Sequence, residues 1–124
     1  MDRAVVQGVK LMARPIPKKL LIHSATQKHG VPTEDDTGAR SWPSSRALTH
    51  VRFEPTTKLV MSKDNKEVQL AAIMFFDRQN SAPTTAAFAV GDGITQTDGA
   101  QYQIQVIDIL NDEKGMHHLE IGLI

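Results

Sequence analysis

The chain has 124 residues, which fits one domain that buries roughly two-thirds of its unfolded surface. Its 14 Lys and Arg balance its 14 Asp and Glu, which argues against a protein that holds nucleic acid or an anionic membrane through overall charge. The absence of cysteine excludes a disulfide framework and a thiolate metal site, and it suits a chain that folds in a reducing cytoplasm.

Residues 1–14 form a mixed apolar and polar segment that predicts a short helix or a docking tail. Pro15 and Pro17 stop any helix and favour extended backbone before them, so a single β-barrel domain is expected over residues 15–124. Residues 20–27 (LLIHSATQ) alternate between two faces and predict a first strand.

Residues 28–45 (KHGVPTEDDTGARSWPSS) change to a Gly, Pro and acid-rich composition that predicts a long loop. A loop of this length inside a compact domain is usually functional or disordered. It is therefore either a partner contact, with Trp42 as an apolar anchor, or a solvated excursion.

Residues 46–55 (RALTHVRFEP) alternate again and predict a second strand, with Arg52 and Glu54 as an exposed polar ladder on one face. Residues 56–62 are weakly extended, and residues 63–66 (KDNK) have the composition of a turn. Together they predict a β-hairpin.

Residues 67–77 (EVQLAAIMFFD) are the best candidate for a central strand. Alternation in its first half gives way to an apolar run over residues 73–76, as in a strand that passes from a half-exposed sheet into an enclosed core. Asp77, Asn80, Ser81 and Pro83 end this strand.

The C-terminal part predicts three consecutive antiparallel strands. Residues 84–90 are expected to form one helical turn or a short strand. Residues 94–97 and 102–110 flank an Asp-Gly pair that suits a tight primed turn. Residues 116–124 close the chain as a further alternating strand.

Six or seven strands without a strong amphipathic helix indicate a mainly β fold, either a barrel or a sandwich. We favour a small antiparallel β-barrel with long loops and a short N-terminal tail or helix, because closing the sheet removes exposed strand edges.

No residues predict catalysis, a cofactor or a metal site. The chain has 5 histidines, but His117 and His118 are neighbours on a strand and should point to opposite faces, where they cannot share one ion. No Gly-x-Ser-x-Gly elbow places a base beside a nucleophile. The acids Glu34, Asp35 and Asp36 are interpreted as hydrated loop residues. An oligonucleotide-binding barrel would need a basic groove and stacking aromatics, of which the chain has few.

Several short blocks, in a fixed order, carry a resemblance to a known family. They are residues 17–23 (PKKLLIH), 50–55 (HVRFEP), 64–70 (DNKEVQL), 75–77 (FFD) with Asn80 and Ser81, 91–92 (GD) and 117–123 (HHLEIGL). With these blocks the chain resembles the minor capsid proteins of tailed phages and prophages of Gram-positive bacteria.

The resemblance implies a virion component, made in the bacterial host cytoplasm and placed at the portal vertex. Such a component would be similar to head-completion or stopper proteins. These are small barrels that assemble as rings, join head to tail and retain packaged DNA. The implied partners are portal or adaptor proteins, tail-completion proteins, further copies of the chain and, in passing, double-stranded DNA, with no membrane.

We therefore expect assembly contacts from residues 28–45 and from the hairpin 56–66. The candidate interface residues are Trp42, Arg40, Arg52, Glu54, Lys58, Lys63 and Asp64. The alternative is a small nucleic-acid-binding β-barrel that acts on its own.

Overall fold

The computed structural model describes residues 15–62, 64–113 and 115–124. Two earlier expectations, the helix or tail over residues 1–14 and the interface role of Lys63, lie outside the described residues. The elements in chain order are the 3-10 helix η2 (Lys18–Leu20) and the strands β1 (His23–His29), β2 (Thr33–Glu34), β3 (Arg40–Ser41), β4 (Ser44–Pro55), β5 (Leu59–Met61), β6 (Glu67–Gln69), β7 (Ala72–Asp77), β8 (Gly93–Gln96), β9 (Gln101–Asp112) and β10 (Gly115–Leu123).

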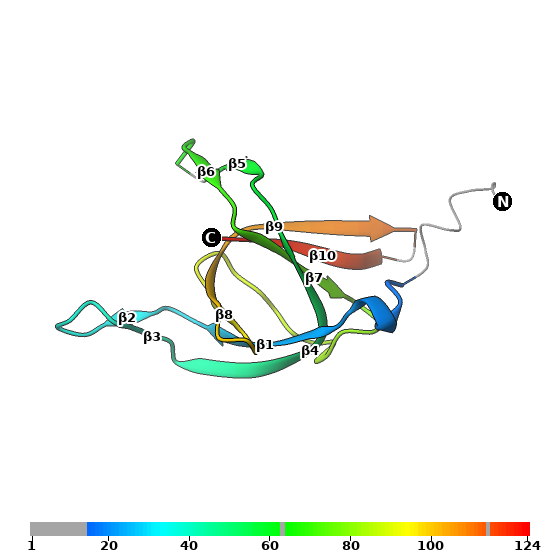
Figure 1. The fold of residues 1–124 in the computed structure, drawn as a ribbon, viewed down its shortest axis with the longest axis horizontal. Helices are drawn as coiled ribbons and strands as arrows, with labels where there is room; N and C mark the ends of the chain where they lie inside the picture. The colour runs from blue at the N-terminus through cyan, green and yellow to red at the C-terminus, as the bar shows by residue number, and fades with distance from the viewer. Residues whose placement is uncertain (1–14, 63, 114) are drawn as a thin grey trace.

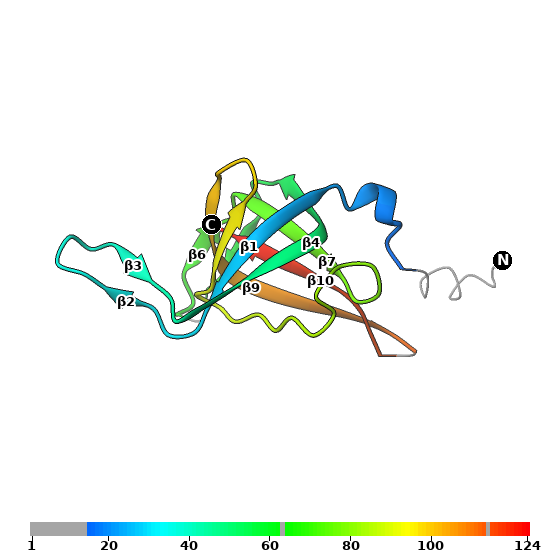
Figure 2. The same cartoon turned by 90° about the horizontal axis from the view of Figure 1, so that it is seen from below.

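Six of these strands close into a barrel in the order β1-β4-β7-β10-β9-β8. Every neighbouring pair is antiparallel, and the pairing of β1 with β8, from Ala25 opposite Gln96 to Lys28 opposite Gly93, completes the ring. Two hairpins, β2–β3 and β5–β6, form separate two-stranded sheets that project from the barrel (Figures 1 and 2). The expectation of a mainly β, closed antiparallel barrel is confirmed.

The inward-facing residues of the barrel strands form one apolar core, as their alternation requires. At its centre Phe76 is 1% exposed and meets Phe88 edge to face at 5.2 Å between ring centres. The buried apolar residues of this cluster are Ala25, Leu48, Val51, Phe53, Ala72, Met74, Phe76, Ile94, Ile104, Leu119, Ile121 and Leu123.

The expected central strand, residues 67–77, is two strands rather than one. The chain leaves β6 at Leu70 and Ala71 before it enters β7, because Leu70 donates its N–H to Lys58 O (2.9 Å) while Ala71 donates to Leu123 O (2.7 Å). One residue therefore completes the hairpin and the next joins the barrel. The apolar half behaves as expected, with Phe76 buried and Phe75 half-buried on the outer face.

Two boundaries near the N-terminus also differ from expectation. The first strand begins at His23 rather than at Leu20, because Pro17 (φ −57°) leads into the 3-10 turn of η2. Residues 28–45 are not one loop. Their first and last residues extend β1 and β4, and the middle folds into the hairpin β2–β3 with Thr33 opposite Ser41.

Some of the remaining expected elements are confirmed and others are wrong. The strand over residues 46–55 and the hairpin after it are confirmed as β4 and β5–β6, and the three consecutive C-terminal strands are confirmed as β8, β9 and β10. The primed turn is wrong, because Gly99 takes φ +98° while Asp98 is not among the positive-φ residues, and a type I′ turn needs both. Residues 84–90 contain neither a helix nor a strand.

Candidate functional site

The hairpin β2–β3 is the tip of a longer projection, which we call the arm (residues 30–43). Figure 1 shows the arm leaving the barrel at the end opposite to η2. Its tip is organised by Asp35, whose Oδ1 accepts the N–H of Thr37 (2.8 Å), the N–H of Ala39 (3.0 Å) and the hydroxyl of Thr37 (2.7 Å). These hydrogen bonds lower the pKa of Asp35, and the one from the Thr37 hydroxyl contributes most. The ionised carboxylate therefore holds the turn at the tip closed.

Close packing at two glycines closes the base of the arm and fixes it to the barrel. Gly30 has φ +107°, and a Cβ added there would lie 2.4 Å from Pro43 Cγ. A Cβ on Gly93 of β8 would lie 3.3 Å from Trp42 Cη2. The Trp42 ring therefore packs against its own barrel, so part of its anchoring role is within the chain.

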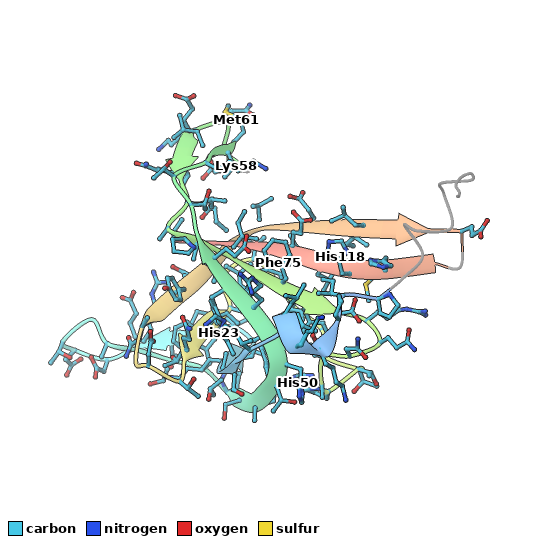
Figure 3. The ribbon with its side chains drawn as sticks, turned by 45° about the vertical axis from the view of Figure 1, so that its right-hand side comes forward. His23, His50, Lys58, Met61, Phe75 and His118 are labelled. Carbon is cyan, nitrogen blue, oxygen red and sulfur yellow. The ribbon has the colours of Figure 1, made fainter. Side chains whose placement is uncertain are left out.

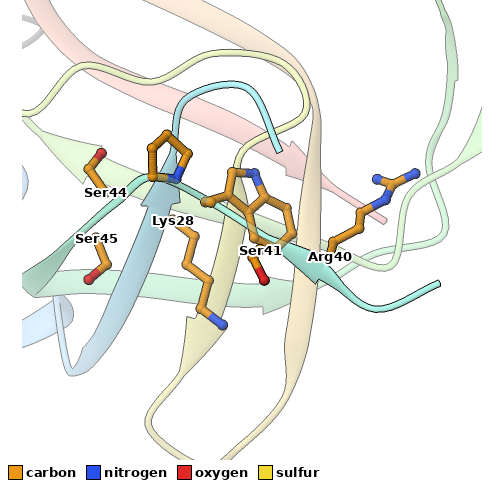
Figure 4. Close-up of a pocket in the computed structure, with 7 residues that line it drawn as sticks. Lys28, Arg40, Ser41, Ser44 and Ser45 are labelled. Carbon is orange, nitrogen blue, oxygen red and sulfur yellow. The ribbon is translucent and has the colours of Figure 1, made fainter. Parts of the chain in front are cut away.

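A hollow of about 300 Å³ lies at this base (Figure 4), lined by Pro43 and by Lys28, Arg40, Trp42, Ser41, Ser44 and Ser45. Lys28 Nζ is 5.9 Å from the centre of the Trp42 ring, within reach of a cation–π interaction. The indole Nε1 is buried and has no hydrogen-bond partner in the part of the chain that the structure describes. No carboxylate is among the described residues that line the hollow.

The hairpin β5–β6 projects from a different part of the barrel (Figures 1 and 3). Its two faces differ, because Leu59 and Met61 are 57% and 58% exposed while Val60 lies between them on the other face. Val60 lines a narrow gap with Leu70, Ile73, Val106 and Gly122 on the outside of the barrel. The hairpin is thus seated on the barrel by one face and leaves a large apolar pair on the other.

Arg52 and Glu54 form the exposed ladder that their spacing predicts, which is confirmed by a distance of 2.9 Å between Arg52 Nε and Glu54 Oε2. Arg52 also donates from Nη1 to Leu20 O at 3.1 Å. This pair therefore helps to hold the segment before β1 against β4.

The structure does not place the candidate interface residues at one site. Arg40 and Trp42 line the hollow, whereas Lys58 lies on the hairpin side, in the gap under β5. Asp64 is exposed in the turn of that hairpin.

The geometric argument about the histidines is wrong. The pairing of β10 with β9 shifts between Met116 and His118, and this irregularity brings His117 Nδ1 to 2.8 Å from His118 Nδ1. His118 Nε2 in turn lies 3.0 Å from Glu120 Oε2. Even so, the described residues contain no group of three or more His, Cys, Asp or Glu side chains that could hold a metal ion.

Two buried aspartates were missed by sequence reasoning, although both lie in blocks that carry the family resemblance. Asp77 is 0% exposed, and its carboxylate accepts the N–H groups of Ile16 (2.9 Å), Gln79 (3.0 Å) and Asn80 (2.9 Å). Asn80 donates to Ile16 O at 2.7 Å. The block FFD with Asn80 therefore clamps the segment that leads into the barrel.

Asp92 holds several segments together through its buried carboxylate at the base of the arm. Its Oδ2 is within hydrogen-bond distance of His29 Nδ1 (2.7 Å), Gln27 Nε2 (3.0 Å) and the N–H of Ala89 (3.0 Å). The Asx-like composition of both blocks was a signal for such local bonding, but their burial was not visible in the sequence.

Comparison with known proteins identifies one family. The family described as "Minor capsid protein" matches residues 17–123, which includes the whole barrel and both projections. No curated protein and no solved structure matches the chain. Among the described residues, no helix is long and apolar enough to cross a membrane. The chain belongs to the minor capsid protein family, a family of structural components of the phage virion.

Proposed function

We propose that this protein is a head-completion subunit of a tailed phage, a stopper-like connector between head and tail. Copies of it assemble into a ring at the portal vertex, contact portal or adaptor proteins on one side and tail-completion proteins on the other, and help to retain packaged DNA. Membership of a capsid family supports the virion role. We assign no catalytic residue to this function.

The observation that carries the proposal is a closed barrel with two hairpins that leave it. Closing the sheet satisfies the backbone of the barrel strands internally, so recognition by other subunits falls to the projections. Among these, the hairpin β5–β6 presents Leu59 and Met61 side by side on one face, each more than half exposed. Exposed apolar side chains that are grouped in this way are typical of protein interfaces.

We assign the assembly contacts to the arm, with Arg40 and Trp42, and to the hairpin, with Lys58, Asp64, Leu59 and Met61. Arg52 and Glu54 are assigned to the rim of these contacts, because they are partly exposed and rim charges contribute little to affinity.

Complementation of a phage that lacks this gene tests the proposal. The double change Leu59→Ser and Met61→Ser is expected to leave filled heads without tails, because truncating an interface anchor costs roughly 2 kcal/mol or more per contact. Its stability in isolation should change by less than about 0.5 kcal/mol, since both side chains are exposed.

The matched control is Ile22→Ser, which removes a side chain that is 67% exposed outside both projections. Normal joining of heads to tails by the double variant would contradict the assignment of the hairpin. Normal, infectious particles in the absence of the whole gene would contradict the proposed function. Tight binding of duplex DNA by the isolated protein at physiological salt would favour instead a barrel that acts on its own.

A further inference from the structure

We infer that the hollow at the base of the arm is a binding site for the phosphate backbone of duplex DNA. The choice of DNA rests on the proposed function, which brings packaged DNA past this protein. The hollow itself is argued from its side chains, which combine two cations, three hydroxyls and one aromatic ring.

Both cations have charge to offer a ligand. Lys28 forms no ion pair with any described residue, and its Nζ is instead over the Trp42 ring at 5.9 Å. Arg40 is paired with Glu34, but through Nε alone and at 3.4 Å. The Arg40 and Glu34 side chains are 44% and 58% exposed, so their ion pair is weak and Arg40 can easily exchange Glu34 for another anion. Lysine and arginine are the residues that most often bind DNA phosphates.

The neutral donors point to the same ligand. Ser44 donates its hydroxyl to His29 O at 3.1 Å, whereas the hydroxyls of Ser41 and Ser45, which also line the hollow, make no hydrogen bond with the described residues. The indole N–H of Trp42 has no acceptor there either, but it is buried, so the serine hydroxyls and the two cations are the groups that a ligand in the hollow can reach. The phosphates of a DNA backbone carry acceptor oxygens and negative charge, which suit such a lining.

The walls of the hollow are held in place before any ligand arrives. Pro43 is packed against Gly30, and the Trp42 ring is packed against Gly93. Behind them His29 is held by the buried carboxylate of Asp92 at 2.7 Å. A site that is already ordered loses less conformational entropy on binding. Because the chain as a whole has a formal net charge of +0, each subunit should bind DNA weakly, through this one site.

The chain contains 1 Trp, so the indole N–H resonance in a nitrogen-15 NMR spectrum reports on this hollow alone. Titration of the full-length protein with a short mixed-sequence DNA duplex at low salt is expected to shift that resonance with a saturable curve. The double change Lys28→Gln and Arg40→Gln should weaken the fitted affinity about tenfold and reduce the slope of log K against log salt by about 2.

The matched control is Lys18→Gln with Lys19→Gln, which removes the same charge from η2 at the other end of the molecule. It should bind as the unmodified protein does, because neither lysine lines the hollow. A second variant, Ser41→Ala with Ser45→Ala, should weaken binding without changing the salt slope. In each variant, unchanged resonances of residues remote from the substituted positions show that the fold is intact.

Three results would overturn the inference: an indole resonance that does not move at saturating duplex, an equal loss of affinity in both charge variants, or a shift with inorganic phosphate but none with duplex. Failure of the proposed function has a different outcome. In that case phage lacking the gene would be normal while the isolated protein still bound duplex at the indole. If both ideas hold, particles with Lys28→Gln alone join heads to tails but lose DNA, because Lys28 lines the hollow and is not assigned to the assembly contacts.

Discussion

The two hairpins that leave the barrel are similar in construction and opposite in chemistry. Each is a two-stranded antiparallel sheet, which is marginal on its own in water. The arm is held at its base, by the contacts of Gly30 with Pro43 and of Gly93 with Trp42, and its tip is polar. The hairpin β5–β6 is held along one face, by Val60 and Leu70 over Gly122, and its free face is apolar.

The difference teaches how a small barrel can carry two kinds of contact. A projection that is fixed only at its base leaves a concave surface between itself and the barrel, and here that surface is lined by cations and hydroxyls. A projection that is packed against the barrel by one face leaves only a narrow gap there, and its outer face can present apolar side chains to another protein. The first suits an anionic ligand and the second suits a protein partner.

The largest loss of stability is expected from a change in the core of the barrel that carries both hairpins. Phe76→Ala should lower the free energy of unfolding by about 3 to 5 kcal/mol, because the ring is fully buried. Phe75→Ala, the matched change on the half-buried outer side of the same strand, should cost about 1 to 2 kcal/mol. Urea unfolding followed by Trp42 fluorescence measures both. Equal losses at the two positions would show that the barrel wall is buried on both sides.

Smaller effects are expected from paired changes that loosen one hairpin at a time. In Gly122→Ala the new Cβ would lie 2.6 Å from Val106 Cγ1 and 2.8 Å from Leu70 Cδ1. In Gly30→Ala it would meet Pro43 at a backbone φ of +107°. Each change should cost about 1 to 3 kcal/mol through crowding or backbone strain.

Amide hydrogen exchange separates these two variants. The Gly122 change should speed exchange in β5–β6 and leave the arm protected, and the Gly30 change should do the reverse. Faster exchange of both hairpins in either variant would mean that the two projections are coupled through the barrel, against the independence proposed above.

The smallest effect is expected when acid weakens the hydrogen bonds at the tip of the arm. Because hydrogen bonds to its carboxylate lower the pKa of Asp35 in the folded protein, the stabilisation is present above the ordinary pKa of an aspartate. It is lost as pH falls through the lowered value. The protection factors of the Thr37 and Ala39 amides, which correct for the slower intrinsic exchange in acid, should therefore fall at acidic pH, while those of β5–β6 are unaffected.

Asp36 provides the control for this pH dependence, since it is an exposed neighbour with the same charge. Asp35→Asn should abolish the acid-dependent step, and Asp36→Asn should preserve it. If the acid-dependent change persisted in Asp35→Asn, it would belong to another titratable group.

Prediction from sequence succeeded where local pattern decides the structure. Residues 46–55 alternate cleanly, and they form β4 with Leu48, Val51 and Phe53 buried. The inward register changes within that strand, however, at His50, which takes φ 55°. The same local pattern identified the C-terminal strands, but it missed the irregularity that turns His117 toward His118, since a shift in pairing depends on the partner strand.

The candidate site was only half visible in the sequence. Composition singled out residues 28–45 and Trp42 as unusual, because a long Gly and Pro-rich segment inside a domain is usually functional. It could not show that Lys28, at the end of β1, lies over the ring of Trp42. That approach exists because β1 and β4 pair and carry both ends of the arm back to the same edge of the barrel.

The sequence by itself determined the mainly β class, most of the barrel strands, the turn of the β5–β6 hairpin and the family, because alternation and turn chemistry act over a few neighbouring residues. Tertiary structure alone decided where the run from Glu67 to Asp77 divides, how the barrel closes and what lines the hollow. Those features depend on hydrogen bonds such as Ala71 N–H to Leu123 O and on glycines that admit a distant ring. Contacts between residues far apart in the chain leave no periodic mark on it.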